Sequence, residues 1–184
     1  MYGLVNKGVE RMVRGTFGDE AWHQVREGAG LEDEPFLSMR TYPDSVTWDL
    51  VQSASSTLDV EPDAVLRAFG HYFIRYSTEE GYGQLLSLFG ADLHGFLLNL
   101  DALHARIGLS FPELHPPTFS VDRVGDGEVY LHYRSQRQGL GAFVLGLVEG
   151  LAARFNETVS VASVARQVDG ADHDIIAVRW ESAA

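Results

Sequence analysis

Three polar residues at two-residue spacing could bind an anion in the segment YLHYRSQRQGLGAFVLGLVEG, residues 130–150. Tyr133, Ser135 and Arg137 follow an alternating stretch that is typical of a β-strand. Because strand side chains alternate between two faces, we expect all three to point the same way. Two hydroxyls and a guanidinium suit one or two carboxylates or phosphates. An ordinary polar strand face, with Arg137 paired to a nearby acid, has the same spacing.

A histidine on an apolar segment could supply a metal ligand. The seven histidines include no H-E-x-x-H pair. His104, however, lies on the apolar side of a helix predicted over 91–107, beside Leu100, Leu103 and Ile107. A single neutral imidazole is the usual proximal ligand of haem iron. A core histidine bonded to a backbone carbonyl would fit the same position.

The glycines that follow do not form a nucleotide-binding loop. Gly139, Gly141 and Gly146 belong to a G-x-G-x-x-x-x-G run, which departs from the G-x-G-x-x-G fingerprint. Gly146 and Gly150 instead allow a predicted helix to approach a neighbour or a flat ligand closely. The chain has no P-loop, G-x-S-x-G or zinc signature, and no cysteine for a disulfide or a thiolate ligand.

Composition narrows the classes of partner. The formal net charge of −12 argues against nucleic acids and anionic membranes as partners. No apolar run reaches the roughly 18–20 residues that span a bilayer, and no signal peptide is evident. We therefore expect a cytoplasmic protein.

The secondary-structure elements that must position these residues are expected to be helices in the N-terminal part of the chain and mostly strands in the C-terminal part. We expect one α+β domain over 1–184, with a helical part at about 1–60 and a ligand-binding and sheet part at about 61–184. The apolar periodicity predicts helices over 3–14, 19–27, 45–57, 62–76, 82–89, 91–107 and 140–155. The alternation predicts a hairpin around Gly-Asp-Gly 125–127, a strand or a mix of strand and helix over 158–167, and a final strand over 174–181.

Taken together, these segments resemble haem-nitric oxide/oxygen binding (H-NOX) domains. The resemblance covers essentially the whole chain and is closest to cyanobacterial stand-alone members and the haem domain of the soluble guanylate cyclase β subunit. The motifs that carry it are Y-x-S-x-R at 133–137, N-L-D-A-L-H at 99–104, the opening MYGLVN, and the runs EEGYG, GLSFPELHPP and DHDI.

The resemblance implies a haem b (Fe protoporphyrin IX) with His104 as the proximal iron ligand. Tyr133, Ser135 and Arg137 would bind the two propionates, which explains a polar set beside an apolar helix. A porphyrin is apolar over most of its surface and anionic at one edge.

Further contacts follow from the same resemblance. Leu147 and Leu100 would line the haem pocket, which the helices and the sheet would enclose. Pro117 and Val5 would press on the macrocycle. Asp44 would pair with Arg137 and hold its guanidinium in place.

The distal side is expected to select the gas. By resemblance, Phe143 occupies the position at which oxygen-binding relatives have a tyrosine that donates a hydrogen bond to dioxygen. Phe73 occupies the position at which those relatives have a second polar partner. The resemblance therefore implies a sensor that binds NO and CO and excludes O2. Entry of Tyr2, Tyr72 or His71 into the pocket would supply the missing donor and give an O2-binding H-NOX protein instead.

The expected function is signalling rather than catalysis. The chain carries no output domain before Ala184, so the signal is expected to reach a separate effector. By resemblance, this is a histidine kinase, a diguanylate cyclase or phosphodiesterase, or a cyclase-like protein. The alternatives are a haem enzyme that processes peroxide or NO, a haem carrier and a non-haem lipid-binding module.

Overall fold

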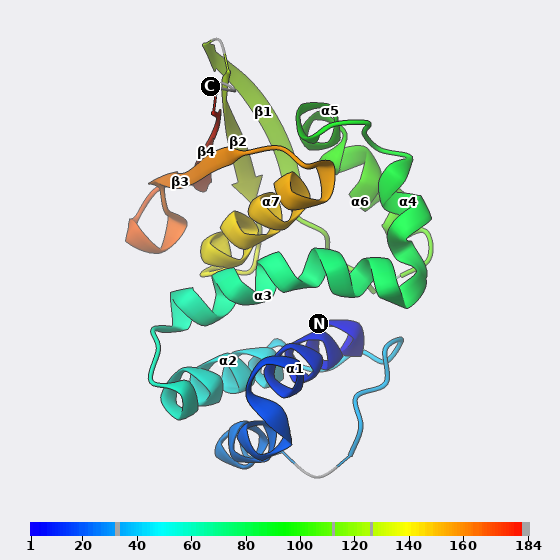
Figure 1. The fold of residues 1–184 in the computed structure, drawn as a ribbon, viewed down its shortest axis with the longest axis vertical. Helices are drawn as coiled ribbons and strands as arrows, with labels where there is room; N and C mark the ends of the chain where they lie inside the picture. Colours follow the sequence, from blue (N-terminus) through cyan, green and yellow to red (C-terminus); the bar gives the residue numbers. More distant parts are fainter. Residues whose placement is uncertain (32–33, 112, 126, 182–184) are drawn as a thin grey trace. The chain divides into compact units, whose positions relative to one another are not determined.

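The computed structural model describes residues 1–31, 34–111, 113–125 and 127–181 (Figure 1). It confirms the α+β class: helices precede and flank a four-stranded antiparallel sheet. The chain divides into two compact units, Met1–Phe69 and Gly70–Ala184. Pro112 of the GLSFPELHPP run and Asp126 of the predicted hairpin turn lie outside the described residues.

The first unit is helical. Its elements are α1 (Gly3–Gly28), α2 (Asp44–Leu58) and the start of α3 (Pro62–Ser77). The two predicted N-terminal helices form one element with a kink at Gly18, where φ is 89° and ψ is 174°. Glycine adopts this conformation at little cost, which explains why the helical pattern breaks there. Val13, Trp22 and Leu50 are fully buried in the core of this unit.

The second unit has short helices before its sheet. They are the π-helix η1 (Thr78–Tyr82), α4 (Gly83–Ser87), α5 (Leu93–Leu98) and α6 (Leu100–Gly108). The single helix predicted over 91–107 is wrong, because the chain leaves helical geometry at Asn99 (φ −102°, ψ 8°). The Asn99 side chain donates to the carbonyls of Gly95 and Phe89 at 2.9 and 3.1 Å, which holds the break.

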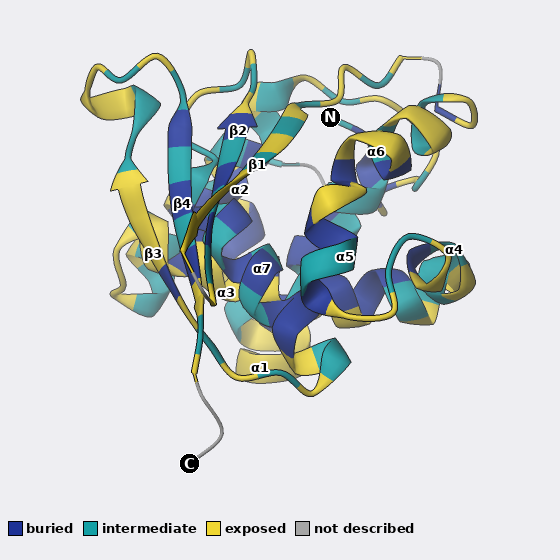
Figure 2. Ribbon diagram, turned by 90° about the horizontal axis from the view of Figure 1, so that it is seen from above, coloured by how far each residue is buried: buried dark blue, intermediate teal, exposed yellow. Residues whose placement is uncertain are grey.

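The sheet has the strand order β1-β2-β4-β3. Its strands are β1 (Thr118–Gly125), β2 (Glu128–Arg134), β3 (Val159–Ala165) and β4 (Asp174–Trp180), with a short 3-10 helix η2 (Gln167–Asp169) between β3 and β4. The predicted hairpin and both later strands are therefore present. Buried and partly exposed residues alternate along β2 and β4, so one face of the sheet covers the core (Figure 2).

Helix α7 (Gly141–Phe155) packs with the sheet and with the second half of α3. A Cβ added at Gly70 would lie 2.1 Å from the carbonyl oxygen of Phe143, and one at Gly150 would lie 2.7 Å from that of His71. The two helix backbones therefore meet at glycines, which is the close approach predicted for Gly150.

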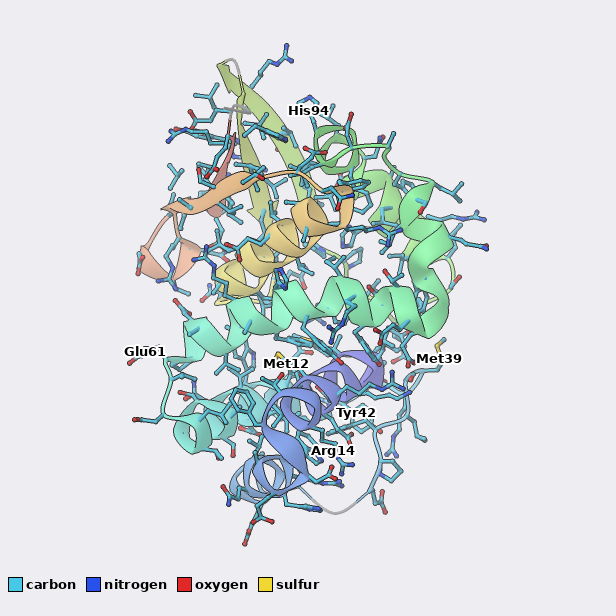
Figure 3. The ribbon with its side chains drawn as sticks, in the orientation of Figure 1. Met12, Arg14, Met39, Tyr42, Glu61 and His94 are labelled. Atoms are coloured by element: carbon cyan, nitrogen blue, oxygen red, sulfur yellow. The ribbon has the colours of Figure 1, made fainter. Side chains whose placement is uncertain are left out.

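A carboxylate ties α5 to the sheet. Glu157 accepts the backbone N–H of Leu93 at 2.7 Å and the indole N–H of Trp180 at 2.5 Å. His94, the next residue on α5, is labelled in Figure 3. Its ring packs edge-on against Trp180, with ring centroids 5.8 Å apart. The N-terminus of α5 is thus fixed to β4.

Candidate functional site

The ring of His104 is oriented by the turn of α6 that precedes it. Its Nδ1 lies 2.8 Å from the carbonyl oxygen of Leu100, so Nδ1 carries the proton and donates. Nε2 therefore keeps its lone pair, which is the form that ligates a metal. Burial lowers the pKa of His104, against the opposing effects of the Leu100 hydrogen bond and Asp101. The ring is thus a neutral imidazole at pH 7.

Phe119 connects His104 to the polar strand. Its ring lies 5.1 Å from the His104 ring and 5.4 Å from the Tyr133 ring, centroid to centroid. The backbone N–H of Phe119 donates to the Asp101 carboxylate at 2.6 Å, which joins α6 to β1. The sequence analysis missed both roles, although Asp101 stands inside the N-L-D-A-L-H motif.

The prediction that Tyr133, Ser135 and Arg137 share one strand face is wrong. Strand β2 ends at Arg134, and only Tyr133 belongs to it. The Ser135 hydroxyl accepts the backbone N–H of Arg137 at 3.0 Å, which is a turn of the kind that serine favours. The chain therefore bends away from the strand direction after residue 134.

The same three residues remain neighbours at the end of the strand. Burial raises the pKa of Tyr133, and Asp174 adds to this, while Ser135 and Arg137 oppose it. The phenol thus keeps its proton and can donate a hydrogen bond. Arg137 Nη1 donates to the carbonyl of His115 at 3.0 Å, so the guanidinium is held beside the segment that leads into β1.

Apolar residues of the predicted site lie on four segments of the second unit. Leu100 is buried on α6, Leu147 is half-buried on α7, and Pro117 is half-buried just before β1. Phe73 on α3 and Phe143 on α7 meet edge to face, with centroids 5.9 Å apart. Neither phenyl ring brings a hydrogen-bond donor.

The residues proposed as alternative donors have other surroundings. In the second unit, His71 is exposed, and the Tyr72 ring stacks on Tyr76 at 6.3 Å with the Arg75 guanidinium 4.9 Å from its centroid. In the first unit, Tyr2 is buried and pairs with Thr41 through a β-bridge.

Val5 and Asp44 belong to the first unit, so their predicted contacts with haem and with Arg137 stay predictions. Val5 is half-buried near the start of α1. The Asp44 carboxylate accepts from the N-terminal ammonium of Met1 at 2.6 Å.

The donor set of the second unit fits a haem. A neutral imidazole with a free lone pair suits iron, and a protonated phenol with a neighbouring guanidinium suits propionates. Over the residues described, no three or more His, Asp or Glu side chains gather to hold a metal ion. A haem iron needs only one such side chain as its protein ligand.

Comparison with known sequences also indicates a haem-binding protein. The sequence model of the family described as Haem-NO-binding matches residues 2–163. The soluble guanylate cyclase gcy-32 of Caenorhabditis elegans is 34% identical over 157 residues, which is 84% of this chain and 23% of that protein. The β-2 subunit of the soluble guanylate cyclase of Rattus norvegicus is 39% identical over 102 residues, 55% of this chain and 15% of that protein. The chain thus spans less than a quarter of either cyclase.

Solved structures share the fold. An H-NOX protein from S. oneidensis in the Fe(II)NO state superposes with a TM-score of 0.89 at 21% identity, covering 99% of this chain and all of that one. The unliganded Fe(II) H-NOX protein from K. algicida gives a TM-score of 0.86 at 24% identity, covering 100% and 98% of the two chains. In the part of the chain that the structure describes, no helix is long and apolar enough to cross a membrane.

Proposed function

Because the chain belongs to the Haem-NO-binding family of gas-sensor domains, we propose that it senses nitric oxide at a ferrous haem b. NO and CO are its ligands, O2 is excluded, and a change at His104 is passed to a separate effector protein. The main support for this proposal is the orientation of the His104 ring. Its hydrogen bond to the Leu100 carbonyl leaves Nε2 as the unprotonated nitrogen.

The propionate side of the site is supported by the end of β2. Tyr133, Ser135 and Arg137 offer two hydroxyls and a guanidinium within five residues of chain. The hydroxyl of Tyr133 is held protonated by burial, and Arg137 suits planar, bidentate binding of a carboxylate. Leu100 and Leu147 would then face the apolar body of the ring, and Pro117 and Val5 would press on it.

Exclusion of O2 is supported by the phenyl pair Phe73–Phe143. Bound dioxygen develops negative charge and gains from a hydrogen-bond donor, while NO and CO gain much less. A hydrogen bond to a charged group contributes roughly 1.5–3 kcal/mol, which is about tenfold to a hundredfold in affinity. Phenylalanines offer no such donor.

Signalling is assigned to α6. Ferrous haem supplies the iron that binds NO and the iron–histidine bond that NO weakens. If Nε2 were no longer held by iron, His104 would be free to move with α6, and the Asp101–Phe119 hydrogen bond would carry that movement to β1. The break at Asn99 lets α6 shift while Glu157 keeps α5 on the sheet. Such a switch requires two arrangements of similar free energy.

The effector is a histidine kinase, a diguanylate cyclase or phosphodiesterase, or a cyclase-like protein, and the proposed location is the cytoplasm. The guanylate cyclase relatives support a signalling partner of this kind. The domain itself is not proposed to catalyse a reaction.

The absorption spectrum of the purified protein with added haem tests this function. We expect a five-coordinate ferrous spectrum, no stable oxygenated form in air and a large shift of the Soret band with NO. A protein that stays colourless after haem reconstitution would overturn the haem assignment. A stable oxygenated form would overturn O2 exclusion, and sustained turnover of peroxide would favour an enzyme.

A further inference from the structure

An arginine at the end of α7 holds the junction at which α3 gives way to the π-helix η1. Arg154 lies in the last turn of α7 and is half-buried. Its Nη1 donates to the hydroxyl of Thr78 at 3.2 Å. Its Nη2 donates to the carbonyl of Gly83 at 3.2 Å and to the hydroxyl of Ser87 at 2.9 Å. One side chain thus ties α7 to the first residue of η1 and to α4.

The three acceptors of Arg154 are two hydroxyls and a carbonyl, so these contacts are hydrogen bonds to neutral groups and not ion pairs. They depend on the planar guanidinium, whose N–H groups point in fixed directions. A lysine, with one ammonium on a flexible stem, would not hold the same acceptors in one arrangement. This geometry favours a role in positioning the junction over a role in neutralising charge.

The Thr78 hydroxyl continues the network into α3. It donates to the carbonyl of Ile74 at 2.8 Å while it accepts from Arg154, because a hydroxyl has one proton and two lone pairs. The neighbouring Ser77 hydroxyl donates to the carbonyl of Phe73 at 2.7 Å. Hydroxyls that bond four residues back often bend a helix. The direction of the last turn of α3 therefore depends on side chains, and Arg154 holds one of them.

This network lies just beyond the phenyl pair proposed for the gas-binding side. Phe73 of α3 meets Phe143 of α7 with ring centroids 5.9 Å apart. At Gly70 and Gly150, an added Cβ would meet the backbone of the other helix, so these positions limit how closely α3 and α7 approach. The glycine contacts set a minimum separation, whereas the hydrogen bonds of Arg154 resist an increase in it.

We propose that Arg154 is a positioning residue for the gas-binding side, which holds the end of α3 against α7 and so sets the separation of Phe73 and Phe143. The inference rests on the proposed function, because the phenyl pair can affect a gas only if haem occupies the site. In this role Arg154 touches neither the gas nor the haem and acts through Thr78 and α3.

Infrared and flash-photolysis measurements on the CO-bound ferrous protein test this role. In Arg154→Met the CO stretching band should shift or broaden, and CO should rebind several-fold faster, because the phenyl rings can separate. Thr78→Val, which replaces the hydroxyl by a methyl group, should act in the same direction. Thr78→Ser keeps the hydroxyl and should behave as the unaltered protein does. Arg123→Met, which removes an exposed arginine of β1, is the matched control and should change neither measurement.

Amide hydrogen exchange and denaturant unfolding of the same variants separate positioning from general stability. Amides of residues 77–83 should exchange faster in Arg154→Met and in Thr78→Val than in Arg123→Met, and equal exchange would overturn the inference. An unmoved CO band with unchanged rebinding in Arg154→Met would overturn it as well, whatever the loss of stability, and leave the proposed function standing. If Arg154→Met does not fold, Thr78→Val decides in the same way. A protein that binds no haem would instead overturn the proposed function, and this inference with it.

Discussion

The His104 side and the Phe143 side of the candidate site are built in opposite ways. Around His104, polar atoms are fixed by hydrogen bonds to the backbone, as in the pairs His104–Leu100 and Asp101–Phe119. Around Phe143, two helix backbones meet at glycines and phenyl rings fill the space beside them. Under the proposed function, retention of the cofactor and choice of gas therefore depend on different elements, and each can be altered alone.

The largest expected effect comes from His104→Gly. Loss of the only proposed iron ligand should abolish proximal coordination, which the ferrous absorption spectrum reports, and added imidazole should restore it. His94→Ala is the matched control, because that ring packs on Trp180 and should leave the spectrum unchanged. A His104→Gly spectrum identical to that of the unaltered protein would contradict the assignment.

On the other side, Phe143→Tyr should create the missing donor and leave cofactor retention unaffected. A hydrogen bond to bound dioxygen of roughly 1.5–3 kcal/mol should raise O2 affinity about tenfold to a hundredfold, measured by gas titration. NO affinity should change far less. Phe17→Tyr, at an exposed ring of α1, should change neither affinity, and an unchanged O2 affinity in Phe143→Tyr would place the distal site elsewhere.

The contact between α3 and α7 at their glycines should tolerate substitution less well than the polar side of the site does. In Gly150→Ala the new Cβ would meet the His71 carbonyl at 2.7 Å, and such overpacking costs about 1–3 kcal/mol of unfolding free energy. Denaturant unfolding of the haem-loaded protein measures it. Gly15→Ala has no atom within 4 Å of the new Cβ and should be neutral or stabilising. Equal stabilities would mean that α3 and α7 do not pack tightly.

Tyr133→Phe should have the smallest effect. It removes one proposed propionate donor, worth about 1 kcal/mol or roughly fivefold in haem affinity, which haem transfer to an acceptor protein measures. Tyr130→Phe, on the other face of β2, is the matched control. Faster haem loss from the control than from Tyr133→Phe would reverse the assignment of the two faces.

Most of the fold could be predicted from local pattern, and the exceptions have local causes. The break at Asn99 was missed because the apolar spacing of Leu93, Leu97 and Leu100 continues through it. The bend after Arg134 was missed because alternation continues in the letters, while the Ser135 hydroxyl bonds the backbone two residues on.

The candidate site is harder to predict from the sequence than the fold is. Spacing alone singles out His104 and the set Tyr133, Ser135 and Arg137, but their assignment to a haem comes from resemblance, and their roles stay predictions. The contact of Phe119 with Tyr133 depends on strand register, because the two residues lie opposite each other only when β1 pairs with β2 as observed. Local periodicity carries no such information.

The interruption at Asn99 also bears on how quickly the domain could respond. Because α6 has only 9 residues and starts after the break, it can move without unwinding a longer continuous helix. Hinge motions and helix register shifts fall in the microsecond-to-millisecond range, whereas local unfolding can take up to seconds. A proximal segment built in this way is suited to report a brief pulse of gas.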